Sequence, residues 1–72
     1  MPYGACRHNV NGPGGHDEVY EELNAQGELT GFVVVLDGNL VGHFPPTDGG
    51  LQNAIQEANN TAALPPPPPP GF

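Results

Sequence analysis

Residues 31–44 read GFVVVLDGNLVGHF, and this stretch carries the strongest local structural signal of the chain. Two runs rich in β-branched and aromatic residues, Gly31–Leu36 and Leu40–Phe44, are separated by a short polar segment that begins with Asp37-Gly38. Asp-Gly is a preferred pair for a two-residue β-turn, because both residues tolerate the positive φ angles that such a turn requires. The stretch therefore predicts an antiparallel hairpin.

Both faces of this hairpin are expected to be apolar. In the register of a tight turn, Val35 lies opposite Leu40 and Val34 lies opposite Val41. A hairpin with one side in water would alternate apolar with polar residues, so this one needs cover on both sides. Any apolar area that stays uncovered is a candidate interface. One face is expected to carry Val33, Val35, Leu40 and Phe44, and the other Phe32, Val34, Leu36, Val41 and His43.

A helix is predicted before the hairpin, from Asp17 to about Gln26. Asp17 can cap it, the following acidic residues suit the positive end of a helix, and Gly27 suits a left-handed stop. A strand over Glu18–Leu23 is the alternative interpretation of the same residues.

A second helix is predicted after the hairpin. Pro45-Pro46 ends the second strand, and Thr47 or Asp48 can cap the helix that follows. Asn59-Asn60 is expected to end it. The apolar residues of this helix recur at helical spacing and form an amphipathic stripe: Leu51, Ala54, Ile55 and Ala58. We expect this stripe to cover one face of the hairpin.

Irregular segments are expected at both ends of this small unit. The turn-forming cluster Asn11–Gly15 predicts an extended arm over residues 1–16. Residues 60–72 form a linker and a tail with six consecutive prolines, which favour an extended polyproline helix. The predicted fold is therefore α+β: a minimal hairpin flanked by two short helices in residues 17–59, with an irregular N-terminal arm and a polyproline C-terminal tail.

The charge of the chain restricts its partners. It has eight acidic residues, one arginine (Arg7) and no lysine, for a net charge of −7. Binding to nucleic acid or to an anionic membrane depends on basic side chains, so neither partner is expected.

The longest apolar run, Phe32–Leu36, is too short to span a bilayer, and Met1–Gly4 does not resemble the start of a signal peptide. The expected location is therefore a virion or the cell interior.

The residues that could carry chemistry are few and poorly spaced. Cys6, His8 and His16, with His43 or Asp17 as a fourth ligand, are the residue types that zinc prefers, but their spacing does not match zinc motifs. Cys6 has no second cysteine for a disulfide, and a flexible arm would not hold it in catalytic geometry with a histidine. No catalytic residue, cofactor or metal is therefore expected, and the chain is predicted not to be an enzyme.

The leading hypothesis is a non-catalytic structural subunit that braces its neighbours in a large assembly such as a phage virion. Its build is similar to that of small decoration proteins, although no diagnostic residues are shared. The alternatives are a soluble adaptor whose proline tail is bound by a groove domain, and an acidic inhibitor of a basic site. Without its partner, the chain is expected to be poorly folded or self-associated. The predicted partner-binding residues are Phe32, Val34, Leu36, Val41, Leu64, Pro65, Pro66, Pro67, Pro68, Pro69, Pro70 and Phe72.

Overall fold

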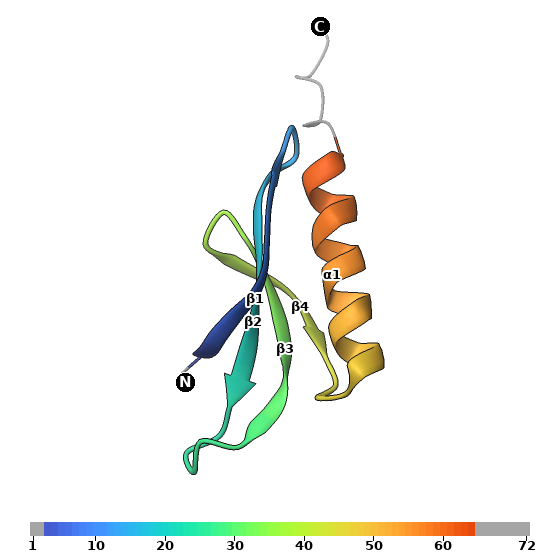
Figure 1. Ribbon diagram of the computed structural model, residues 1–72. Coiled ribbons are helices and arrows are strands. Elements are labelled where there is room, and N and C mark those ends of the chain that lie inside the picture. Colours follow the sequence, from blue (N-terminus) through green and yellow to red (C-terminus); the bar gives the residue numbers. More distant parts are fainter. Residues whose placement is uncertain (1–2, 65–72) are drawn as a thin grey trace, which may run out of the picture.

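The computed structural model describes residues 3–64, and these form a four-stranded antiparallel sheet with one helix against it (Figure 1). The strands lie in the sheet in chain order, so each pairs with its sequence neighbour. This overturns the predicted hairpin between two helices. In chain order the elements are β1 (Tyr3–Gly12), β2 (Gly15–Leu23), β3 (Leu29–Leu36), β4 (Asn39–Phe44) and α1 (Asp48–Ala63).

The hairpin of β3 and β4 confirms the sequence prediction. Asp37 and Gly38 form the turn with φ angles of 49° and 86°, and Val35 pairs with Leu40 as expected. The next expected pair is wrong, because Val34 lies opposite Gly42 and the register shifts at this point. The shift leaves Val41 as an extra residue in β4, and one extra residue moves every later side chain to the other face.

Residues 17–23 belong to strand β2, so the predicted helix over Asp17–Gln26 is wrong and the strand alternative is correct. Val19 is fully buried and pairs with Val34 of β3. A strand paired in this way sends alternate side chains of the segment into the core, and a helix over the same residues could not form this pairing. The long-range pairing therefore outweighs the local helix signals, as tertiary context often does.

The predicted N-terminal arm is also wrong, because Tyr3–Gly12 is an ordered strand, and a turn at Pro13 and Gly14 connects it to β2. The glycines of this connection allow a close approach to α1. The Gly14 amide donates to the Ala62 carbonyl at 2.8 Å, and a Cβ on Gly14 would overlap the Thr61 carbonyl oxygen. Glycine is required here by backbone contact, and a turn-rich composition alone does not reveal that contact.

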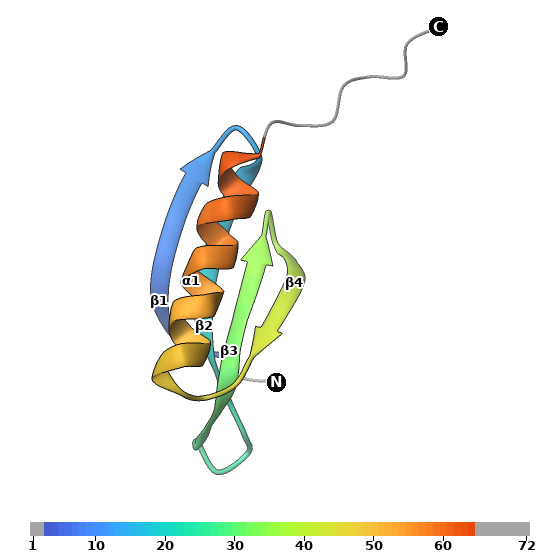
Figure 2. The ribbon, with the colours of Figure 1, turned by 90° about the vertical axis from the view of Figure 1, so that its right-hand side faces the viewer.

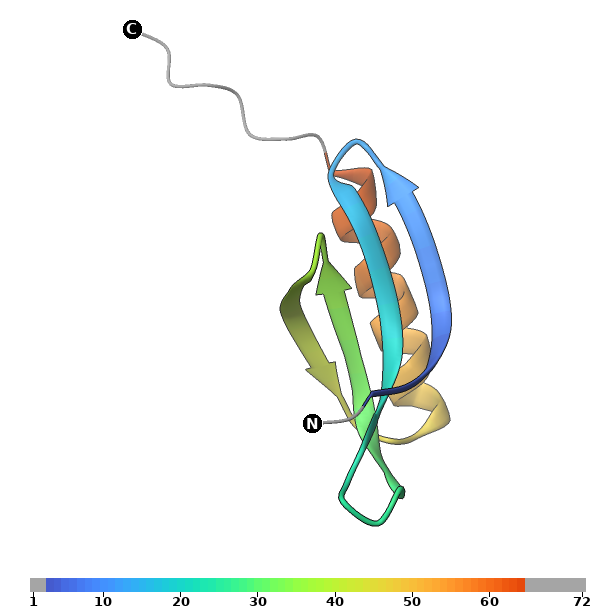
Figure 3. The ribbon, with the colours of Figure 1, turned by 90° about the vertical axis from the view of Figure 1, so that its left-hand side faces the viewer.

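Helix α1 lies on a single face of the sheet, which Figure 2 shows from the helix side and Figure 3 from the opposite side. Thr47 caps it as predicted, by accepting a hydrogen bond from the Gly50 amide at 2.9 Å. The helix continues past the predicted end at Asn59-Asn60 to Ala63. Small residues four positions apart are buried along it, so the helix can lie close to the sheet: Gly50, Ala54, Ala58 and Ala62.

The core lies between α1 and the strands. Its buried members are Val19, Phe32, Val34, Ala54 and Ala58, with Val10, Phe44, Leu51 and Ile55 partly buried around them. Burial of a Val or Phe side chain contributes about 1.5–3 kcal/mol, so each of the three strand residues contributes substantially to stability. The predicted helical stripe is therefore confirmed as the packing face of α1.

Candidate protein-binding surface

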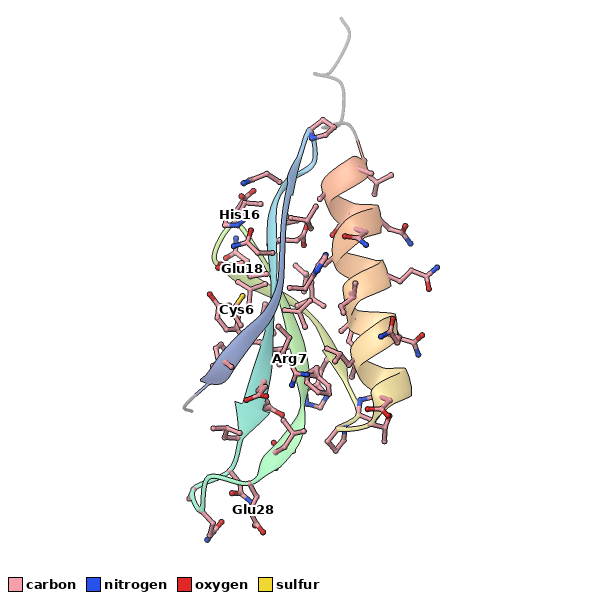
Figure 4. All side chains as sticks on the ribbon, viewed as in Figure 1. Cys6, Arg7, His16, Glu18 and Glu28 are labelled. Carbon is pink, nitrogen blue, oxygen red and sulfur yellow. The ribbon has the colours of Figure 1, made fainter. Side chains whose placement is uncertain are left out.

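The face of the sheet turned away from α1 carries aromatic, acidic and apolar side chains, and we call it the open face. Strand alternation and pairing place each of its members. Cys6, His16 and Glu18 project to this side, whereas Arg7 lies on the side of α1 (Figure 4). The open face consists of Tyr3, Cys6, Asn9, Asn11, His16, Glu18, Tyr20, Glu22, Val33, Val35, Leu40 and His43.

An apolar strip crosses the open face toward strand β4. Val33 is fully buried by its neighbours, and Val35 beside it is 9% exposed. Leu40, the partner of Val35 on β4, is 59% exposed, and Val41 at the bulge is 45% exposed. The strip thus runs from covered valines to Leu40, which is largely open to solvent, with Val41 exposed beside it on β4.

Strand β4 is an edge of the sheet, because among residues 3–64 it pairs only with β3. Edge strands are commonly protected against further pairing by charged side chains or proline within the strand. Strand β4 has neither over Asn39–Phe44, so the bulge at Val41 is the one protective feature of this kind along its edge. The outer edge of β4 therefore offers backbone donors and acceptors next to exposed apolar side chains.

The acidic groups of the open face are held by neighbouring side chains. The Tyr20 hydroxyl donates to Glu18 Oε2 at 2.7 Å, and His43 Nε2 lies 2.7 Å from Glu22 Oε1. The hydrogen bond to Glu18 raises the pKa of Tyr20, and burial and the charge of that carboxylate act in the same direction. Both glutamates are thereby fixed in position on either side of Tyr20.

The only arginine lies on the other side of the sheet. Its Nη1 atom is 2.8 Å from Glu21 Oε2, and its guanidinium carbon is 5.9 Å from the centre of the Phe32 ring. Arg7 therefore neutralises Glu21 on the α1 side and leaves the carboxylates of the open face without an arginine or lysine partner from this chain.

The predicted partner-binding residues are scattered over the structure. Phe32 and Val34 are buried beneath α1 and serve the core, and Leu36 is half-buried on the same side. Val41 is exposed on β4, and Leu64 is 59% exposed just after α1. The other predicted residues, Pro65–Pro70 and Phe72, lie outside the described residues.

The candidate metal ligands do not converge. His8 faces α1, where its Nε2 atom lies 2.8 Å from Asn59 Oδ1, while Cys6 and His16 face the other way. Within residues 3–64 no group of three His, Cys, Asp or Glu side chains is placed to hold a metal, and no cavity is found. In the same part of the chain, no helix has the length and apolar character needed to cross a membrane.

Sequence reasoning missed Tyr3, Glu18, Tyr20 and Glu22 as surface residues of one face. The sequence around them, Asp17-Glu18-Val19-Tyr20-Glu21-Glu22, has no clear period of two, so it gives no strong signal for one face of a strand. Tyr3 joins them only through the pairing of β1 with β2, which depends on residues nearly twenty positions apart.

Comparisons of this chain with protein-family models, with curated protein sequences and with solved structures find no match.

Proposed function

We propose that this chain is a non-catalytic accessory subunit that attaches to a larger protein assembly, such as a virion, through its open face and the β4 edge. The observation that carries the proposal is the exposure of Leu40 and Val41, at 59% and 45%, on an edge strand without charge or proline. A partner strand placed beside β4 would gain backbone hydrogen bonds and cover both side chains.

The charge of the chain supports the same type of partner. At a net charge of −7, its surface repels acidic proteins and attracts basic ones. The β4 edge carries no formal charge, so apolar and backbone contacts there would not be opposed by local repulsion. The proposal therefore places apolar contact at β4 and electrostatic contact over the rest of the open face.

The test is size-exclusion chromatography of the tagged chain from cells that express it with its natural partners. We expect the wild-type chain to elute with a large assembly and the variant Leu40→Asp to elute alone. Gln56→Asp is the matched control, because it adds the same charge on an exposed position of α1. Elution of the wild-type chain alone, or equal retention of both variants, would refute the proposal.

The alternative function is an adaptor that is bound through its proline run. Deletion of residues 65–72 distinguishes this adaptor from the proposed accessory subunit. The six consecutive prolines Pro65–Pro70 are the sequence feature that favours it. If the deletion releases the chain and Leu40→Asp does not, the adaptor function replaces the one proposed. If both release it, the tail contributes to the same attachment through avidity.

A further inference from the structure

Two tyrosines form a stacked pair on the open face. The rings of Tyr3 and Tyr20 lie 5.8 Å apart between centroids, with 18° between their planes. Tyr3 is 44% exposed, so the outer ring of the pair is accessible from solvent. A stack of this kind offers a flat aromatic surface that is already ordered before a partner arrives.

Carboxylates flank this aromatic surface on the same face. Glu18 and Glu22 stand two residues before and after Tyr20 along β2, and Glu22 also pairs with Tyr3 across the strands. Glu18 uses one oxygen in its contact with Tyr20, and Glu22 uses one in its contacts with His43 and Thr30. Within residues 3–64 the second oxygen of each accepts no hydrogen bond. The two carboxylates therefore retain acceptor capacity beside the rings.

The combination of aromatic ring and carboxylate suits a guanidinium group better than an ammonium group. Guanidinium is planar, stacks on aromatic faces and presents parallel donors to a carboxylate, whereas lysine offers a point charge. The chain itself contains one example of this pairing: Arg7 contacts both Glu21 and the Phe32 ring on the α1 side.

We propose that Tyr3 and Tyr20, together with Glu18 and Glu22, form a site for an arginine side chain of the protein partner. This inference rests on the proposed function and adds the chemistry of the partner's contact. The arginine would stack on the exposed Tyr3 ring and donate to the second oxygen of Glu22 or Glu18. This site lies at one end of the open face, and the apolar β4 edge lies at the other end.

The test uses the full chain, titrated separately with a hexa-arginine and a hexalysine peptide at low ionic strength and followed by NMR. We expect hexa-arginine to bind more tightly than hexalysine by about two- to fivefold, which is the size of one exposed cation–π contact. The largest shifts should fall on Tyr3, Tyr20, Glu18 and Glu22. This comparison needs no variant, so it holds even if a substitution impairs folding.

Substitutions then assign the preference to the site. Tyr3→Ser should remove the preference for arginine, whereas Tyr3→Phe should keep it because the ring remains. Glu22→Gln should weaken binding of both peptides more than the matched control Glu57→Gln on α1. Equal affinity for the two peptides, or shifts centred on α1, would overturn the proposed site.

The experiments distinguish failure of the arginine site from failure of the proposed function. If hexa-arginine shows no preference while Leu40→Asp still releases the chain from its assembly, attachment through the open face stands and the arginine site falls. If the arginine preference is found while Leu40→Asp releases nothing, the site binds arginine but the proposed function is refuted.

Discussion

Replacement of Asp17 by valine should stabilise this protein. The Asp17 side chain is fully buried on the α1 side of the sheet, opposite Val10 and Leu36. Within residues 3–64 neither of its carboxylate oxygens has a hydrogen-bond partner. A buried polar group left without a partner costs about 1–3 kcal/mol, and more if it is charged. Valine is β-branched and suits a strand, and although its methyl groups are bulkier than the carboxylate oxygens, it brings no polar atom that needs a partner.

The expected gain in the free energy of unfolding for Asp17→Val is about 1–3 kcal/mol. For a domain of this size, each kcal/mol corresponds to a shift of about 4–8 °C in the melting temperature. The assay is thermal and urea unfolding followed by circular dichroism, with Asp17→Asn as the matched control. The amide removes the charge but leaves unpartnered polar atoms, so Asp17→Asn should lie between the wild type and Asp17→Val. A valine variant less stable than the wild type would refute this reasoning.

Three further predictions concern the glycines and the tyrosine pair. Gly50→Ala should lower the free energy of unfolding by about 1–3 kcal/mol in urea unfolding, because a Cβ there would overlap a carbonyl oxygen of the preceding loop. The control Gly49→Ala has space for its Cβ, so it should leave the free energy of unfolding unchanged or raise it by up to about 1 kcal/mol. Gly38→Ala should cost about 1–2 kcal/mol in the same assay, because its φ of 86° is strained for any residue with a Cβ, and an unchanged midpoint would contradict the turn geometry. In a phenolate absorbance titration, Tyr20 should ionise above its ordinary pKa of about 10, and Glu18→Gln should move that pKa downward. Since the folded chain then keeps a proton that the unfolded chain has lost, stability should fall as the pH rises from 10 through the raised pKa.

The hairpin and the last helix could be predicted because their signals are local. Asp37-Gly38 sets the turn within two residues, and Thr47 caps a helix whose apolar stripe has a clear period. The faces of the hairpin could not be assigned fully, because the bulge at Val41 depends on pairing across the strands. That one shift exchanged the sides of His43 and Phe44 relative to the expected register.

The first half of the sheet could not be predicted because its signals conflict with its context. Asp17 and the glutamates after it resemble the start of a helix, yet Asp17 is a buried strand residue without a side-chain hydrogen bond within residues 3–64. The glycines around Pro13 resemble a flexible arm, yet Gly14 is there for its contact with the end of α1. The open face could not be predicted either, because its tyrosine pair forms only when β1 and β2 are both recognised as strands and paired.

The most direct test of attachment through the open face is site-specific photocrosslinking in cells that hold the natural assembly. A photoreactive amino acid is placed at position 40 on β4 and, in a separate chain, at position 56 on the exposed side of α1. We expect position 40 to give one discrete adduct that mass spectrometry identifies as a structural subunit of the assembly, and position 56 to give none. Equal adducts from both positions, or an adduct from position 56 alone, would contradict attachment through this face.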